Sequence, residues 1–163
     1  MGRGDINGEV KIYLIIDKSL NELAAYFGLK AGMVASSRED MPPIEMQRAI
    51  LKEEGVKLLP EVLPGIEISH FAVNDNYRRH AGAEGSVIRG LGEYFYPTFI
   101  YPIIADVASK IGVNMIYLYA AGDEHLVSYY ERVFGFQTLD AEDYFVPLEP
   151  DYDGGCMFMY QLM

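Results

Sequence analysis

The feature that most constrains the fold is a pair of apolar, β-branched segments with one long helical stretch between them. Residues 66–73 (IEISHFAV) and 113–120 (VNMIYLYA) are both typical of buried strands. Residues 93–111 predict a helix that ends at Gly112, with a kink at Pro102. A strand, a helix and a second strand in this order predict a crossover connection, which places the two strands parallel.

Further elements flank this crossover on both sides. An apolar hairpin precedes it, and a short helix with two strands follows it. A surface helix is expected between the hairpin and the crossover, because apolar residues recur there at helical spacing after two prolines. In chain order the flanking elements are the strands 10–17 and 23–31, the surface helix 44–54, the helix 123–134, and strands that open at 136 and at 156. We predict one α/β domain over residues 1–163, an α+β mixed sheet whose central crossover lies between antiparallel hairpins.

The charges are distributed unevenly along the chain. Lys and Arg number 13 against 24 Asp and Glu, a formal net charge of −11. Such a field repels a phosphate backbone, so the sequence predicts no nucleic-acid partner. Three arginines and a histidine nevertheless fall between positions 78 and 89, whereas positions 123–153 carry nine carboxylates and one arginine. A basic loop on an acidic protein suits a small anionic ligand beside a region that attracts cations.

Cysteine and histidine usage argues against a metal site. The single cysteine, Cys156, can form neither an internal disulfide nor a thiolate cluster, and the histidines at 70, 80 and 125 lack metal-ligand spacing. No segment reaches the roughly 18 apolar residues that span a bilayer. We therefore expect a cytoplasmic protein with no metal and no membrane contact.

A glycine-rich segment precedes the central helix. Arg89, Gly90, Leu91 and Gly92 lead directly into Glu93. Glycines let the backbone approach a ligand closely, and the free N–H groups of a helix start bind phosphate oxygens. Each such contact contributes only about 0.3–1 kcal/mol, so several amides and a nearby arginine together are needed to hold a pyrophosphate. The alternative is a plain turn before the helix.

Three segments in this order resemble the GNAT superfamily of acyl-CoA-dependent N-acyltransferases. They are the strand ending at Ala72 and Val73 with Tyr77 and Arg78 behind it, the loop at Gly90 and Gly92, and the helix with Tyr130 and Glu131 before Gly135 and Phe136. The resemblance covers about residues 66–136. It implies the GNAT-like acyl-CoA N-acyltransferase fold, acetyl-CoA as the co-substrate and no metal.

The resemblance leaves two registers for the pyrophosphate loop. Gly90 and Gly92 match the last two fixed positions of the family's loop, while Val87 departs from the Gln or Arg of the first. A register that starts at Arg79 would place Glu84 where the family has a small residue. A carboxylate facing a pyrophosphate is unfavourable, so we prefer the first register and treat residues 77–88 as an enlarged loop whose arginines fold back onto phosphates.

The family's remaining cofactor contacts carry over to named positions. The strand 66–73 is expected to diverge from 113–120, so that its exposed backbone pairs with the pantetheine arm. Asp123 stands where the family has an asparagine at the start of the following helix. The implied cofactor-binding residues are Ala72, Val73, Arg78, Arg79, Arg89, Gly90, Leu91, Gly92, Glu93 and Asp123.

The resemblance also implies the catalytic residues. Tyr130 matches the family's tyrosine, the general acid that protonates the departing thiolate, and Tyr129 is the alternative. The transfer is uphill by about 2 kcal/mol from the reference pKa values of a phenol and a thiol. We choose Glu67 as the base for the acceptor amine, directly or through a water. His70, three residues further along the strand, is expected on the opposite face as a hydrogen-bonded, half-buried residue.

The expected function is transfer of an acetyl group from acetyl-CoA to a primary amine of a small molecule or peptide, in a ternary complex. The alternative is a non-catalytic module that binds acyl-CoA or a partner protein. The family usually has a strand and two helices before the hairpin, where this chain has only a few residues. We therefore expect a homodimer, or a complex with a partner that supplies the missing wall.

Overall fold

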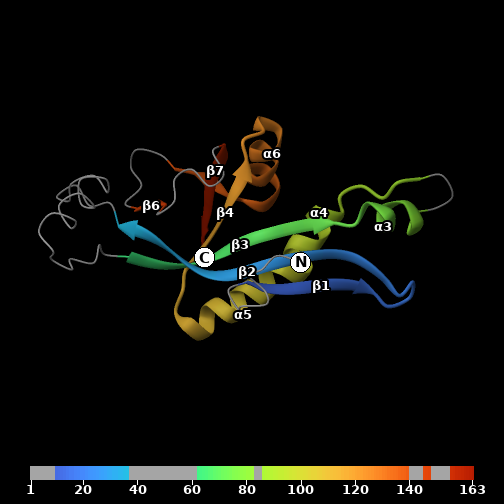
Figure 1. Ribbon diagram of the computed structural model, residues 1–163, viewed down its shortest axis with the longest axis horizontal. Helices are drawn as coiled ribbons and strands as arrows, with labels where there is room; N and C mark the ends of the chain where they lie inside the picture. Colours follow the sequence, from blue (N-terminus) through green and yellow to red (C-terminus); the bar gives the residue numbers. More distant parts are fainter. Residues whose placement is uncertain (1–9, 37–61, 83–85, 140–144, 148–154) are drawn as a thin grey trace, which may run out of the picture.

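The computed structural model describes residues 10–36, 62–82, 86–139, 145–147 and 155–163 (Figure 1). Seven strands form one sheet in the order β1-β2-β3-β4-β7-β5, and β6 pairs with β2. The strands are β1 (Lys11–Asp17), β2 (Glu22–Ser36), β3 (Val62–Val73), β4 (Met115–Ala121), β5 (Gln137–Thr138), β6 (Phe145–Pro147) and β7 (Cys156–Leu162). Among the described strands β3 and β4 pair in parallel and all other pairs are antiparallel. The predicted mixed sheet with a central crossover is confirmed.

The central helical stretch has three consecutive segments. These are α4 (Leu91–Phe95), the π-helical η1 (Tyr96–Ile100) and α5 (Tyr101–Ile111). Pro97 and Pro102 lack the N–H that an α-helix needs, and the π segment lies between Phe95 and Pro102. Where a kink was predicted at Pro102, the structure has a π-helical segment, with wider turns, just before this proline. Gly112 ends α5 with a left-handed φ of 70°, as predicted.

The second helical stretch consists of α6 (Glu124–Tyr129) and the π-helical η2 (Tyr130–Phe134). Asp123 caps it, because its side chain accepts a hydrogen bond of 2.9 Å from the His125 N–H. Within the described part of the chain, no helix is both long and apolar enough to cross a bilayer.

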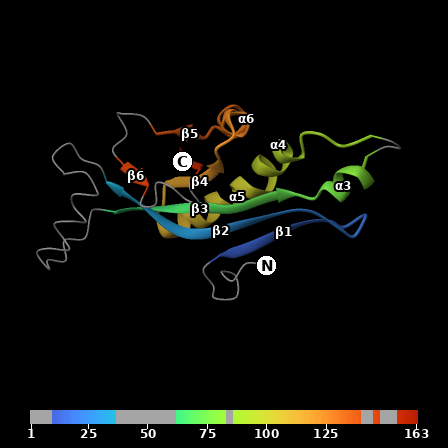
Figure 2. The ribbon, with the colours of Figure 1, turned by 45° about the horizontal axis from the view of Figure 1, so that its top comes forward.

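The main core lies between the sheet and the stretch α4–η1–α5, which runs across β1, β2 and β3 (Figures 1 and 2). Each fully buried aliphatic side chain contributes about 1.5–3 kcal/mol of burial free energy. The core residues include Phe27, Leu29, Ile66 and Ile68 of the strands and Ile100, Ile104 and Ala108 of the helices. A smaller cluster on β2, β4 and β7 gathers Val34, Met115, Tyr117, Phe158 and Tyr160.

Two segments differ from the sequence-based expectation. Residues 77–88 were expected to form an enlarged loop, but Asp75–His80 forms the helix α3. The Asn74 side chain accepts from the Asn76 N–H at its start, and basic residues in its last turn favour the helix dipole. β2 also runs five residues beyond the predicted end, which gives the unpredicted β6 a partner. The predicted helix 44–54 lies outside the described residues.

Candidate active site

The strands β3 and β4 separate after a short contact. They pair only at Ile66 with Ile116 and at Glu67 with Tyr117, and β4 then runs steeply away from β3 (Figure 1). β3 itself continues to Val73 along β2. In the described register, the N–H and C=O groups of β3 that face β4 therefore have no strand partner beyond Glu67. A free backbone edge of this kind is able to pair with an extended ligand.

A β-bulge in β3 lies where the two strands separate. Gly28 of β2 is opposite His70 and Leu29 is opposite Ile68, so Ser69 is the extra residue. A bulge bends its strand and increases the local twist. We infer that this one inserted residue turns the end of β3 away from β4.

A cavity of about 280 Å³ occupies the gap between the two strands. Its wall is mostly aromatic and aliphatic, with one imidazole and several hydroxyl groups. It is lined by Tyr26, Ile68, Ser69, His70, Phe71, Tyr96, Ile100, Leu118, Tyr119, Tyr130, Phe134 and Phe136. Tyr96 and Phe134 stack with ring centres 4.4 Å apart, which joins the two helical stretches beneath the gap. We refer to this space as the strand cavity.

A second cavity of about 540 Å³ lies at the start of α4. It shares Phe71, Tyr130 and Phe134 with the strand cavity, so the two spaces adjoin. Its other lining residues are Val73, Arg78, Val87, Ile88, Arg89, Gly90, Leu91, Gly92, Glu93, Leu126 and Tyr129. We refer to it as the loop cavity.

The loop cavity offers hydrogen-bond donors to an anion. Gly90 takes a left-handed φ of 71° as N-cap of α4 and has no side chain to satisfy the first amides. The Nε of Arg78 is buried and has no hydrogen-bond partner, while its Nη1 lies 3.5 Å from an Asp75 carboxylate oxygen. A buried, unpaired donor is costly, and a phosphate group in the cavity would satisfy it.

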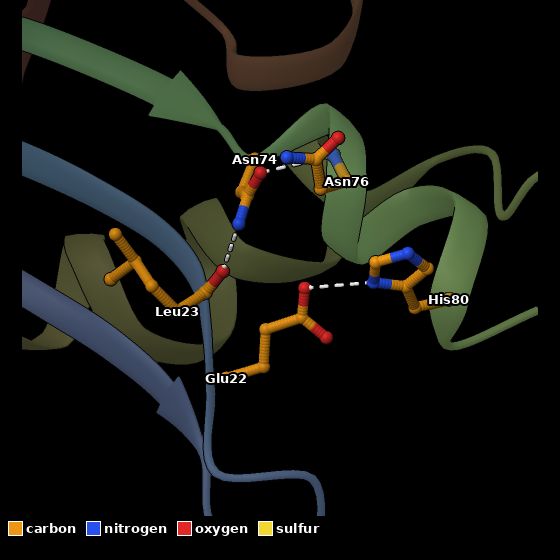
Figure 3. A network of polar contacts seen from close by, with 5 residues as sticks. All are labelled: Glu22, Leu23, Asn74, Asn76 and His80. Atoms are coloured by element: carbon orange, nitrogen blue, oxygen red, sulfur yellow. Dashed lines mark hydrogen bonds and ion pairs between the residues drawn. The ribbon is translucent and has the colours of Figure 1, made fainter.

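The helix α3, which carries Arg78, is tied to the β1–β2 hairpin (Figure 3). Asn74 Nδ2 donates to the Leu23 carbonyl at 2.7 Å, and the Nδ1 of His80 lies 3.2 Å from Glu22 Oε1. Tyr77 Oη also donates to Asp17 Oδ2 at 3.0 Å. The pKa of Asp17 is lowered, first by the hydrogen bond from the Ser19 hydroxyl. These contacts fix the helix relative to the sheet.

The two candidate tyrosines occupy different positions. Tyr130 lines both cavities, whereas Tyr129 lines the loop cavity alone. The Tyr129 hydroxyl lies 3.1 Å from where a Cβ at Gly92 would be. Burial is the main cause that raises the pKa of each phenol, and Glu93 adds to the effect at Tyr129. Both phenols are therefore held protonated, and Tyr130 is the one placed where the cavities meet.

Glu67 lies outside both cavities. It is 6% exposed, its Oε1 is 3.1 Å from Lys30 Nζ, and it accepts a hydrogen bond from Tyr117. Burial first, and then the Glu67 charge, raise the pKa of Tyr117. The role of Glu67 as the base stays a prediction.

The expectation that His70 is half-buried on the face opposite Glu67 is wrong, because His70 is exposed and lies on the same face as Glu67. Their register partners, Lys30 and Gly28, are two residues apart on β2 and thus share a face. The bulge at Ser69 shifts the alternation by one residue, so Glu67 and His70 lie on the same face.

The structure brings together most of the predicted cofactor-binding residues. Val73, Arg78, Arg89 and the run from Gly90 to Glu93 line the loop cavity, while Ala72, Arg79 and Asp123 line neither space. The divergence expected between residues 66–73 and 113–120 is confirmed. Sequence reasoning missed that Ser69 and His70 both line the resulting gap, because a bulge leaves little trace in a strand pattern. One available signal was Gly28, since glycine inside a strand often marks a bulge or a close approach.

No described group of three or more His, Cys, Asp or Glu side chains is arranged to hold a metal. No family model matches the chain. No curated protein matches its sequence.

Solved structures do match over most of the chain. AtaTR bound with acetyl-CoA superposes with a TM-score of 0.59 at 14% identity, covering 98% of this chain and 74% of that one. AtaT complexed with acetyl-methionyl-tRNAfMet gives 0.53 at 15% identity, covering 90% and 76%. A KacTA–DNA complex gives 0.55 at 13% identity, covering 99% and 70%. The likeness shows that this chain has the GNAT fold that its sequence resembles.

The comparisons correct the predicted partners. The sequence predicted a small-molecule or peptide acceptor and no nucleic acid, yet two of the similar structures are complexes with tRNA and with DNA. The prediction of no nucleic-acid partner was based on the net charge of −11. Net charge describes the average field of a protein, whereas a nucleic acid contacts a local surface.

Proposed function

We propose that this protein is an acetyl-CoA-dependent N-acetyltransferase whose acceptor is the α-amine of an aminoacyl-tRNA. Acetyl transfer as the general activity is supported by the similar structures, one of which is bound with acetyl-CoA. The tRNA acceptor is supported by the complex with acetyl-methionyl-tRNAfMet. Within this chain, the observation that carries the proposal is the meeting of the two cavities at Tyr130.

The two cavities fit the parts of acetyl-CoA. The pyrophosphate suits the loop cavity, where Arg78 Nε lacks a partner and Gly90 opens the start of α4. The pantetheine arm suits the unpaired β3 edge after Glu67, along which it is able to form main-chain hydrogen bonds. The thioester then lies near Tyr130, and the acceptor amine approaches through the strand cavity.

The chemistry needs a proton for the leaving thiolate. When the amine nitrogen attacks the thioester carbonyl, the C–N bond forms and the C–S bond breaks. Tyr130, held protonated by burial, gives its proton to the sulfur. The tyrosinate recovers a proton as the new amide nitrogen loses one, so the protons balance.

Three exposed arginines are candidate contacts for the tRNA on this acidic protein. Arg79 and Arg89 are exposed beside the loop cavity, and Arg132 is exposed on η2. We expect these side chains to contact the phosphate backbone, although the net negative charge of the protein repels it. Binding at this contact should therefore weaken as the salt concentration rises.

The test is acetyl transfer from radiolabelled acetyl-CoA to methionyl-tRNA, with deacylated tRNA and methionine methyl ester as matched acceptors. We expect label on the aminoacyl-tRNA, and none on the deacylated tRNA, which has no α-amine. Label on the ester at equal efficiency would reject the tRNA acceptor but keep acetyl transfer. Calorimetric binding of acetyl-CoA without transfer to any amine would instead favour the non-catalytic alternative.

A further inference from the structure

We infer that His70 takes the proton from the acceptor ammonium, held in place by Ser69; this inference rests on the proposed function. An amine is protonated at neutral pH and must lose one proton before its nitrogen attacks a thioester. The structure supplies a group for this step on the wall of the strand cavity, separate from Glu67.

The bulge brings His70 to the cavity. Both Ser69 and His70 line the space between β3 and β4. The Nδ1 of His70 lies 3.0 Å from the Ser69 hydroxyl oxygen, which orients the ring and leaves Nε2 for the acceptor. A regular strand would have placed these neighbours on opposite faces.

The glycine opposite His70 makes room for this arrangement. A Cβ at Gly28 would lie 2.8 Å from the Ser69 hydroxyl oxygen and 3.0 Å from Val10 Cγ1. Such a contact is too close for the hydroxyl to keep its place. Gly28 therefore belongs to the structure that holds Ser69, and through Ser69 the imidazole.

The strand cavity has one residue suited to accept a proton near neutral pH. Besides His70, the ionisable groups among its described lining residues are the phenols Tyr26 of β2, Tyr96 of η1, Tyr119 of β4 and Tyr130 of η2. No Asp, Glu, Lys or Arg is among them. An imidazole is the side chain most often used as a general base, and His70 carries the one imidazole among these described lining residues. Glu67 is committed to Lys30 and lies outside the cavity.

The proton balance closes with both residues. His70 removes the first proton of the ammonium and passes it to solvent after each turnover. The amine nitrogen then forms the amide bond, and its second proton balances the one that Tyr130 delivers to the thiolate. No oxidant, reductant or metal is required.

The experiment compares kcat/KM for acetyl transfer to methionyl-tRNA between pH 5.5 and 9 in the wild type, His70→Gln and His125→Gln. His125 is exposed on α6 and lines neither cavity, which makes it the matched control. We expect His70→Gln to lower kcat/KM about 10²–10⁴-fold and to abolish its acid limb, with acetyl-CoA affinity unchanged. Added imidazole should partly restore His70→Ala, while His125→Gln behaves as the wild type.

The outcomes separate this inference from the proposed function. An active wild type whose His70→Gln variant keeps the same kcat/KM and acid limb overturns the role of His70 and leaves the transferase intact. Loss of the acid limb in Glu67→Gln rather than in His70→Gln assigns the base to Glu67 and also overturns the inference. A wild type that binds acetyl-CoA yet acetylates no amine overturns both.

Discussion

The two halves of β3 show how one strand serves two purposes. Before the bulge, the strand pairs with β2 on one side and β4 on the other, and Glu67 is buried against Lys30 and Tyr117. After the bulge, it keeps β2 but loses β4, and its residues line both cavities. The difference teaches that a single extra residue, Ser69, separates a structural half from a binding half.

The largest expected effect is on turnover, and it concerns the cavities beside the part of β3 that follows the bulge. Tyr130→Phe should lower kcat about 10²–10⁴-fold, because it removes the proton for the leaving thiolate while the ring still fills the wall between the cavities. Steady-state kinetics with acetyl-CoA binding as a parallel measurement check this. Tyr129→Phe is the matched control, and a larger loss in that variant would assign the acid to Tyr129.

The next largest effect is on stability, and it concerns the part of β3 that precedes the bulge. Glu67→Gln removes the carboxylate that lies 3.1 Å from the Lys30 ammonium, and removing one partner of a buried pair costs about 3–5 kcal/mol. The Lys30 side chain is 30% exposed, so we expect a smaller loss, about 1–3 kcal/mol, by urea unfolding. The double variant Glu67→Gln, Lys30→Met should recover part of it. A stable Glu67→Gln protein would break the contrast between the halves.

A smaller effect is expected on cofactor affinity. Arg78→Gln removes the guanidinium whose Nε is buried at the loop cavity, and a charge-assisted hydrogen bond contributes about 1.5–3 kcal/mol. We expect the Kd for acetyl-CoA to rise about tenfold, which corresponds to 1.4 kcal/mol. Arg79→Gln, which lines neither cavity, provides the control in the same calorimetric titration. Equal losses in both variants would show a general charge effect in place of a specific contact.

The smallest effect at neutral pH concerns two buried phenols, Tyr117 of β4 beside Glu67 and Tyr130 of η2 at the cavities. Burial raises the pKa of Tyr117 and of Tyr130 above 10, the ordinary value. The unfolded chain therefore loses these protons first, so the stability they contribute is complete below pH 10 and declines above it. Urea unfolding between pH 8 and pH 11.5 should show a flat range followed by a fall. A decline that begins near pH 8 would contradict the assignment.

The sequence predicted the parts of this molecule that follow from local patterning. The strands at 66–73 and 113–120, the cap at Asp123 and the end at Gly112 are confirmed because apolar runs and capping residues act within a few positions. The loop at Gly90 was found in the same way. These features locate the loop cavity and the phenols beside it.

The gap between β3 and β4 was expected from the family resemblance. The side chains that line it could not be predicted, because they depend on register. The side chains of a strand change faces when one residue is inserted, and the one signal of this insertion, Gly28, lies on the neighbouring strand. The face of His70 was therefore assigned wrongly. The helix α3 was missed for a related reason, since Asn74 and its neighbours are compatible with both a turn and a helix cap.

The wall shared by the two cavities has a thermodynamic consequence. Phe71, Tyr130 and Phe134 line both cavities, so a ligand that shifts these rings in one cavity would reshape the other. Binding in the strand cavity and binding in the loop cavity would then affect each other's affinity. Thermodynamic linkage requires the effect to be equal in both directions. In the proposed reaction, the factor by which bound acetyl-CoA changes the affinity for the acceptor equals the factor by which the bound acceptor changes the affinity for acetyl-CoA.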